Sequence, residues 1–378
     1  MPGVYKRGDQ WYYYFNTGKV DGSYKKICRK GGKTKVEAEK ALRKALEEFE
    51  NTGITQADSN ISVSDYFDYW YKNYVLLNCK YTTQQAYKIV IDKHIKPSLG
   101  DYKLRSITPA TLQEFINLKH VKGFSRASIN NFYGVLSGAL KAAVYPYKYI
   151  KENPMQYIRL PKDNKIKEDE EDLKIISLED FNKIINRFPQ GSSFYIPLQI
   201  AFHTGLRAAE ACGLTWDCID LDNKTLKVEK ILISKGKGIF EFGTPKTKSS
   251  NRTISIGDTL VSILKKHKTY QNENKLRYGQ YYQNSSFVCT KENGEKVTTD
   301  SLKYLSKVVN YELCINFSFH SLRHTHATML LEAGANIKDI QKRLGHSKIA
   351  TTMDTYSHVT EKMKNDTVDI FESLVAKK

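Results

Sequence analysis

The sequence predicts a multidomain protein with a small N-terminal β-sheet plus one helix, an all-α bundle, and an α+β domain that is mainly helical. Three observations predict this order. Aromatic residues with strand character open the chain, a helical period extends from residue 61 to about 161, and both periods are mixed in the remainder. A chain of 378 residues can form two or three cores, because domains usually have ~100–200 residues. We expect domains at 1–55, 60–163 and 172–378.

The first region is predicted to be a basic hairpin backed by a helix. Residues 10–15 form a strand, Asp21 and Gly22 supply the turn, and residues 24–28 return as a second strand. Lysine and arginine far outnumber aspartate here, so a strand face could enter a DNA major groove. A solubility or RNA-binding appendage is the alternative. The helix follows a Thr34 cap and carries apolar residues at Val36, Ala41, Leu42, Ala45 and Phe49.

The second region is predicted to be a bundle of four helices after a polar linker at 51–60. Its apolar stripes are expected to form a core, not a cofactor site. The helices are marked by Val63, Phe67, Trp70 and Tyr74, by residues 82–94 before Pro97 and Gly100, by residues 108–118 with Thr108 as cap and Pro109 following, and by residues 125–144 with Ile129, Phe132, Leu136, Leu140 and Ala143.

The third region follows a charged hinge at 162–172 and mixes helices with strands. We predict helices at 194–204, 208–212, 319–332 and 337–344, with Gly205, Gly334, Asn336 and Gly345 as end signals. We predict strands at 225–233, 239–242 and 252–256, with turns at 234–236 and 244–251.

Charge and cysteine content limit the classes of binding partner and the cellular compartments that fit this sequence. The net charge of +18, the pI near 9.3 and 12% aromatic residues favour an extended polyanion, with nucleic acid as the first candidate. Solubility or codon bias is the alternative explanation for the lysines. Six cysteines without a CxxC pair, an N-terminus without an apolar signal core, and the lack of a ~20-residue apolar stretch predict a soluble cytoplasmic protein without a membrane partner.

A possible active site is distributed over three segments, 204–207, 320–324 and 345–358. Tyr356 offers a covalent nucleophile, and Arg207 and Arg323 offer cations for phosphate oxygens. His320 and His346 offer proton carriers near neutral pH. This set suffices for a DNA strand break, so we expect no cofactor, metal or ATP.

These segments resemble the catalytic domain of tyrosine recombinases, the family of phage integrases, conjugative-transposon integrases and chromosome-dimer resolvases. The resemblance covers residues from about 172 to 360, with the motifs in the family's order. Residues 204–210 are similar to the first arginine box, 320–324 to the His-x-x-Arg box, and 344–347 to the later histidine segment. The resemblance implies catalytic roles for Arg207, Lys248, His320, Arg323, His346 and Tyr356.

The resemblance also bears on a basic hairpin and on one carboxylate. The basic hairpin at 244–252 resembles the loop that presents a catalytic lysine, and we choose Lys248 at its tip over Lys246. Glu210, in the first arginine box, is expected to be a buried support.

The domain order resembles three-domain integrases of bacterial phages or conjugative elements. The resemblance implies arm-type DNA binding by the first domain and core-site binding by the other two. It also implies a homotetramer on DNA, a 3′-phosphotyrosine intermediate, a possible excisionase and host DNA-bending protein, and a nucleoid location in the bacterial host. Apolar residues after Tyr356, namely Val359, Met363, Thr367, Ile370, Phe371 and Leu374, predict a tail helix that docks on a neighbouring protomer or on its own domain.

Four alternatives remain at this stage. His320, His324 and His326 could bind zinc, although the metalloprotease pattern requires Glu where the chain has Ser321. Residues 336–356 could form a helix-turn-helix. A type IB topoisomerase would share the chemistry, and a catalytically idle regulator would need only DNA affinity.

Overall fold

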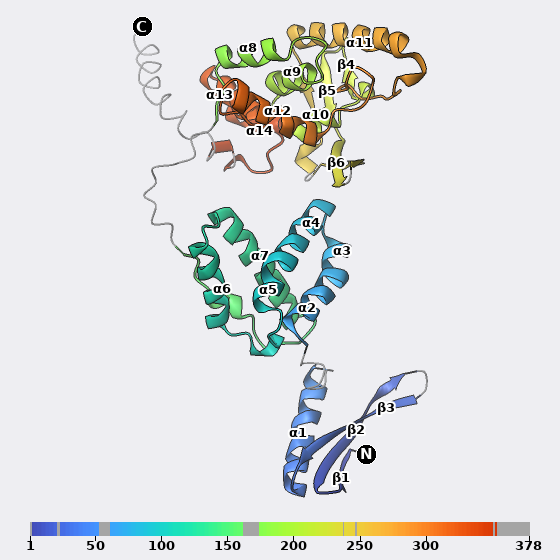
Figure 1. Cartoon of the computed structure of the whole chain (residues 1–378), viewed down its shortest axis with the longest axis vertical. Helices are drawn as coiled ribbons and strands as arrows, with labels where there is room; N and C mark the ends of the chain where they lie inside the picture. The colour runs from blue at the N-terminus through green and yellow to red at the C-terminus, as the bar shows by residue number, and fades with distance from the viewer. Residues whose placement is uncertain are drawn as a thin grey trace, which may run out of the picture. The chain divides into compact units, whose positions relative to one another are not determined.

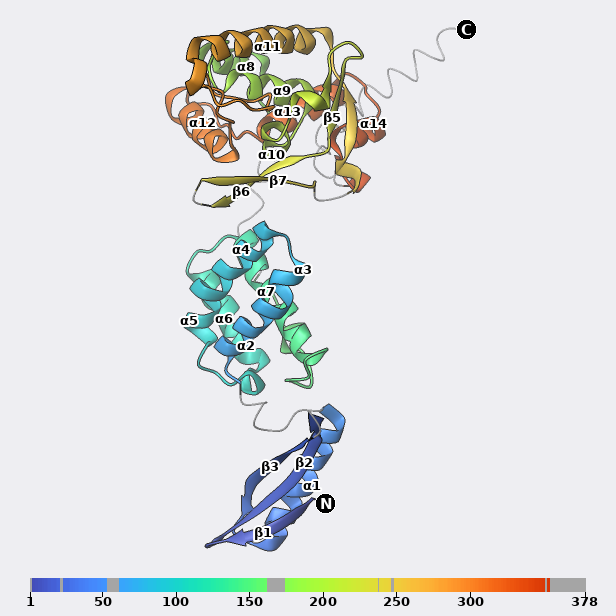
Figure 2. The same cartoon turned by 90° about the vertical axis from the view of Figure 1, so that its right-hand side faces the viewer.

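The computed structural model describes residues 2–20, 23–52, 61–161, 174–236, 238–245, 248–350 and 352–353. The chain divides into two compact units, Met1–Ile166 and Lys167–Lys378. The first unit contains a sheet-plus-helix part and a helical bundle, and the second contains the mixed region (Figures 1 and 2). In the part of the chain that the structure describes, no helix is both long and apolar enough to cross a bilayer.

The N-terminal part is an antiparallel sheet of β1 (Gly3–Arg7), β2 (Gln10–Val20) and β3 (Ser23–Gly32), in that order, with α1 (Lys35–Thr52) along one face (Figures 1 and 2). Because strand residues alternate between faces, Tyr13 and Phe15 are buried on the α1 side. Strand β1 was not predicted, and the predicted turn at 21–22 lies outside the described residues. Val36 lies in α1, at the helical spacing that was predicted, but it is 74% exposed, while Ala38 is buried.

The opposite face of this sheet is aromatic and basic. Tyr5 and Tyr12 stack with ring centroids 5.7 Å apart, and Lys26 Nζ lies 4.0 Å from the Tyr14 ring centroid. Lys30 pairs with Tyr12 in the strand register and is exposed as well. The sheet therefore presents flat rings and positive charge on the face that α1 does not cover.

The helical bundle consists of two long composite helices and two regular ones. The first two each contain one π-helical turn, so their stripes are not strictly periodic. The composite helices are α2 (Val63–Trp70), η2 (Tyr71–Val75) and α3 (Leu76–Asn78), then α4 (Tyr81–Val90), η3 (Ile91–Ile95) and α5 (Lys96–Leu99); α6 (Pro109–Val121), α7 (Arg126–Val144) and the 3₁₀ turns Leu104–Ser106 and Pro154–Tyr157 complete the bundle.

The predicted bundle helices and most of their core residues are confirmed. Thr108 and Ser125 cap α6 and α7 through their side chains, and the α7 stripe is fully buried. Tyr74 was wrongly included in the core, because it is 44% exposed while Val63, Phe67 and Trp70 are buried.

The second unit packs helices around a small sheet. In Figures 1 and 2, α11 lies on one side and the β6–β7 hairpin on the other, with α9 and α10 between them. The strands are β4 (Ile219–Asp220), β5 (Thr225–Val228) and β8 (Arg252–Ser255), in the order β4-β5-β8, and the separate hairpin of β6 (Ile231–Gly236) and β7 (Ile239–Gly243). The helices are α8 (Leu178–Arg187), α9 (Tyr195–Thr204), α10 (Ala208–Cys212), α11 (Asp258–Tyr278), α12 (Thr299–Glu312), α13 (Ser321–Glu332) and α14 (Ile337–Leu344), with 3₁₀ turns at Trp216–Cys218, Lys248–Ser250 and Gly279–Tyr281.

Several predictions for this unit need correction. The strand predicted at 225–233 is two strands, because β5 pairs with β8 whereas β6 pairs with β7. The turn predicted at 234–236 belongs to β6. Helices α8, α11 and α12 were not predicted. The helix expected at 194–204 is confirmed as α9, which contacts α10, α11 and α13.

Candidate active site

The turn between α9 and α10 places Arg207 at the start of a helix. Gly205 ends α9 in the left-handed conformation, with φ 69°. A Cβ built on Gly205 would lie 2.7 Å from Leu344 Cδ2, so this turn needs glycine for its close approach to α14. Arg207 follows as the N-cap of α10.

Glu210 is buried and orients Arg207 through hydrogen bonds. It is 3% exposed, as its predicted role as a buried support requires. Its carboxylate accepts hydrogen bonds from the Arg207 backbone N–H at 3.0 Å and from Arg207 Nη1 at 2.9 Å. Arg252 adds bonds from Nη1 at 3.3 Å and Nη2 at 3.1 Å. Desolvation acts to raise the Glu210 pKa, but Arg252 and Arg207 together lower it, so the carboxylate is ionised.

Arg323 joins the other two motif segments. It projects from α13, is 1% exposed, and donates from Nη1 to the Gly205 carbonyl at 3.0 Å. Its Nη2 donates to the Leu344 carbonyl at 2.8 Å. Since Gly205 precedes the Arg207 turn and Leu344 precedes the His346 turn, one guanidinium connects all three segments.

His320 and His346 are within electrostatic reach of both arginines. Desolvation, then His324, Arg323 and Arg207, lower the pKa of His320 to about 4. Desolvation, then Arg323 and Arg207, likewise lower the pKa of His346 to about 4. Both imidazoles are therefore neutral at pH 7, so each has an unprotonated nitrogen, and each is a weaker base than a free histidine.

The structure thus brings together four of the six predicted site residues, Arg207, His320, Arg323 and His346. The nucleophile Tyr356 lies outside the described residues, as does Lys246. For Lys248 only the backbone is described, at the start of a 3₁₀ turn. The described chain ends near Thr352, whose Oγ1 lies 2.8 Å from His346 Nδ1.

Sequence reasoning missed a second pair of arginines, Arg252 and Arg343. Arg343 donates from Nε to His326 Nε2 at 2.9 Å, from Nη1 to the Ser255 carbonyl at 3.0 Å, and from Nη2 to the His203 carbonyl at 3.1 Å. No periodicity signals these roles. The position of Arg343, directly before the predicted histidine segment at 344–347, is the one available hint.

The hydrogen bonds of His326 argue against the zinc alternative. Its Nδ1 lies 2.8 Å from the Phe202 carbonyl, which can only accept, so Nδ1 carries the proton. Its Nε2 then accepts from Arg343. Both ring nitrogens are engaged, which leaves no lone pair for a metal ion.

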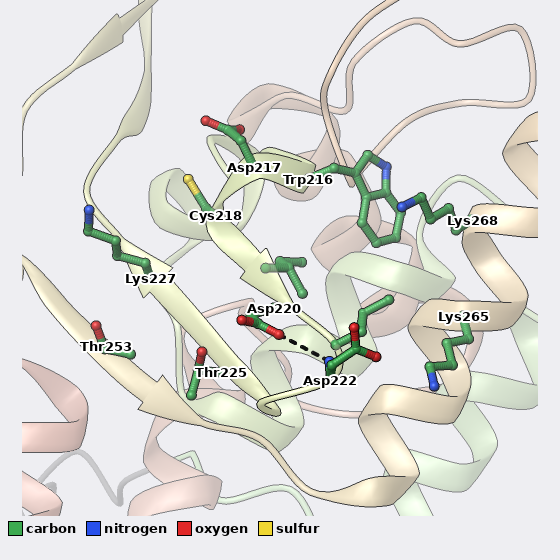
Figure 3. Close-up of a pocket in the computed structure, with 12 residues that line it drawn as sticks. Trp216, Asp217, Cys218, Asp220, Asp222, Thr225, Lys227, Thr253, Lys265 and Lys268 are labelled. Carbon is green, nitrogen blue, oxygen red and sulfur yellow. Dashed lines mark hydrogen bonds between the residues drawn. The ribbon is translucent and has the colours of Figure 1, made fainter.

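A separate hollow of about 690 Å³ lies beside the small sheet and α11 (Figure 3). Two of its carboxylates have partners: Asp217 pairs with Lys230 at 3.0 Å, and Asp220 accepts from the Asp222 backbone at 3.1 Å. Asp217, Cys218 and Glu229 are the one described group whose ligand atoms gather as a metal site requires, but Lys227 binds Glu229 at 2.6 Å. None of the predicted site residues lines this hollow.

Comparison with known proteins identifies the family. Residues 173–363 match the phage integrase family, 62–120 match its N-terminal SAM-like domain, and 3–49 match an arm DNA-binding domain. A XerC-like tyrosine recombinase of Caldanaerobacter subterraneus is 31% identical and aligned over 98% of this chain and 97% of its own length. The ICEBs1 integrase of Bacillus subtilis is 28% identical over 79% of this chain and 81% of its own.

Solved structures agree on the fold. The Tn1549 transposon integrase in complex with transposon right end DNA has a TM-score of 0.66 at 21% identity, and covers 81% of this chain and 99% of its own. A lambda integrase dimer on a core site has a TM-score of 0.57 at 18% identity, with 94% of both chains covered. The arginine boxes, the histidine segment and these matches together show that the chain belongs to the phage integrase family of tyrosine recombinases.

Proposed function

We propose that the protein cuts and rejoins duplex DNA at attachment sites, with Tyr356 as nucleophile, to integrate and excise a mobile element. The observation that carries the proposal is the convergence of Arg207, Arg323, His320 and His346, which come from three distant segments. Two guanidiniums supply forked donors that match the oxygens of a phosphodiester, and two neutral imidazoles can add hydrogen bonds to it.

The chemistry follows from charge. As Tyr356 attacks the scissile phosphate, negative charge grows on the non-bridging oxygens, where Arg207 and Arg323 can stabilise it. The tyrosine has a reference pKa of about 10, so it needs a base, and neutral His320 suits that role. The products are a 3′-phosphotyrosine and a free 5′-hydroxyl.

The remaining groups have supporting roles in this proposal. Lys248 protonates the leaving 5′-oxygen, and we prefer it over Lys246 for its position next to β8. His346 binds the phosphate or positions Tyr356. Because an ester is exchanged for an ester, strand transfer requires neither a metal ion nor ATP, and the protein needs no cofactor.

The domain organisation suggests how DNA is held. We keep the division 1–55, 60–163 and 172–378 as a proposal, with the first domain on arm-type sites and the other two on core sites. The aromatic and basic face of the sheet formed by β1, β2 and β3 supports this role, because tyrosine rings and lysines can contact bases and phosphates.

The proposed assembly is a homotetramer on two duplexes in the cytoplasm of a bacterial host, at its nucleoid. An excisionase and a host DNA-bending protein are possible partners. The tail residues 359–374 lie outside the described part of the chain, and their docking on a neighbouring protomer remains a prediction. Deletion of residues 360–378 with unchanged synapsis would contradict it.

The decisive experiment uses a nicked suicide substrate from the attachment core of the protein's own element, with EDTA and without ATP. We expect a covalent protein–DNA adduct that Tyr356→Phe abolishes. Tyr311→Phe is the matched control, because Tyr311 is 88% exposed on α12. A folded wild type that binds the core but forms no adduct would favour a regulator, and relaxation of site-free supercoiled plasmid would favour a topoisomerase.

A further inference from the structure

Arg252 lies at the start of β8 and has no role among the six predicted catalytic residues. Its side chain is only 7% exposed. It donates to three separate segments: to Glu210 through both terminal nitrogens, to the Ser250 carbonyl at 3.0 Å, and to the Arg343 carbonyl at 2.6 Å. Glu210 belongs to the segment that carries Arg207, Ser250 lies in the lysine hairpin, and Arg343 lies shortly before His346.

The charges around Glu210 make Arg252 more than a structural tie. Arg207 Nη1 lies 2.9 Å from Glu210 Oε1. If the two formed an isolated ion pair, the carboxylate would cancel the positive charge that a phosphate must meet. Arg252 supplies a second guanidinium to the same carboxylate, so the three residues together keep one net positive charge.

We propose that Arg252 is a positioning residue for strand cleavage: it neutralises Glu210, so that Glu210 can orient Arg207 without removing its charge from the scissile phosphate. The inference rests on the proposed function. It explains why a buried carboxylate can support a phosphate-binding arginine without weakening it.

The packing around Arg252 supports this role. Gly345 has φ 69°, and a Cβ on it would lie 3.0 Å from Arg252 Nη1 and 3.0 Å from the Ser249 carbonyl. The guanidinium is therefore enclosed beneath the turn that precedes His346. Arg252 also contributes to the lowered pKa of His346, after desolvation, Arg323 and Arg207.

The test separates an electrostatic role of Arg252 from a purely structural one, because the two roles predict opposite effects of removing the Glu210 charge from the Arg252→Gln variant. Arg252→Gln leaves Glu210 paired with Arg207 alone, and we expect at least a tenfold slower single-turnover adduct formation on the suicide substrate at saturating protein. Glu210→Gln combined with Arg252→Gln removes the unopposed negative charge. We expect this double variant to be at least threefold faster than Arg252→Gln. A purely structural role predicts a double variant that is as slow or slower, and that result would overturn the proposal.

Further variants keep the test decisive. Arg252→Lys retains the charge but loses the forked contact, so it should lose less rate than Arg252→Gln. Arg277→Gln is the matched control, because Arg277 is 72% exposed and pairs with Glu292 at 3.2 Å on the surface. If Arg252→Gln does not fold, a folded Arg252→Lys within threefold of wild type supports the proposal, and a loss of thirtyfold or more contradicts it.

The outcomes also distinguish the two proposals. A wild type that forms no Tyr356-dependent adduct refutes the proposed function itself. A wild type that cleaves normally, together with a folded Arg252→Gln variant that cleaves at the same rate, refutes only the role of Arg252.

Discussion

His346 Nδ1 lies 2.8 Å from the Oγ1 of Thr352, a residue that is 1% exposed and four positions before Tyr356. The bond joins the turn after α14 to the segment that leads to the nucleophile. We expect Thr352→Val, which keeps the shape and removes the hydroxyl, to slow adduct formation roughly fivefold to tenfold, because such a bond contributes about 1 kcal/mol.

Thr352→Ser should retain most of the rate, since it keeps the hydroxyl. Thr328→Val is the matched control, because Thr328 is also buried and its hydroxyl has no hydrogen-bond partner among the described residues. Core-site affinity, measured separately, should remain unchanged in all three variants. An unaffected Thr352→Val rate would show that the bond does not position Tyr356.

Arg343 is expected to stabilise the catalytic unit. Arg343→Met leaves three acceptors without a donor, on Ser255, His203 and His326, and should lower the free energy of unfolding by about 2–4 kcal/mol. Denaturation followed by Trp216 fluorescence, with Trp11 and Trp70 replaced by Phe, would measure it. The surface pair of Arg187 and Glu312, at 2.7 Å, offers the control, because Arg187→Met should cost less than about 1 kcal/mol.

His326 should make the catalytic unit acid-sensitive. Desolvation, then Arg343, lower the pKa of His326 to about 4, whereas an unfolded histidine has a pKa of about 6.5. The folded state therefore disfavours protonation, and its contribution to stability is complete above pH 6.5 and lost as the pH falls from 6.5 towards 4.

His326→Gln provides the comparison, because an amide can still donate to Phe202 and accept from Arg343 without titrating. Over that pH range, wild type should lose up to about 3 kcal/mol more stability than this variant. His267, His320 and His346 titrate in both proteins, so their contributions cancel. Parallel stability curves for the two proteins would contradict the assignment.

Gly205 should not tolerate a side chain. At φ 69° an alanine is strained, and its Cβ would lie 2.7 Å from Leu344 Cδ2 and 3.0 Å from His326 Cδ2. We expect Gly205→Ala to destabilise the unit by about 1–3 kcal/mol and to slow cleavage, because the turn carries Arg207. Gly257→Ala is the control, with φ −82° and open space around its Cβ. Comparable melting of both variants would refute the steric argument.

The aromatic and basic sheet face makes a separate prediction for arm-type DNA. Replacing Lys26 or Lys30 by Gln should weaken binding of the full chain to arm-site duplexes and reduce the slope of log affinity against log salt by about 1 per lysine. Lys44→Gln, exposed on α1, should leave the slope unchanged. Equal effects at all three positions would show that the contact is not confined to the sheet face.

The sequence by itself determined the local features and the motif order. End signals such as Gly205, Ser125 and Gly345 act through their own backbone or side chain, so they are readable without tertiary contacts. The helical period of α7 is readable for the same reason. The arginine and histidine boxes were recognisable because their residue types and spacing are specific to one chemistry.

Only the tertiary structure decided which strands pair and which side chains contact each other. The strand pattern at 225–233 looks continuous, but it divides because β5 and β6 pair with different strands. Val36 has helical spacing yet faces solvent, since the position of the sheet decides which side of α1 is covered. Arg252 and Arg343 resemble ordinary surface charges in the sequence. Their roles depend on a buried carboxylate and on carbonyls far away along the chain, and only folding brings those groups within hydrogen-bonding distance.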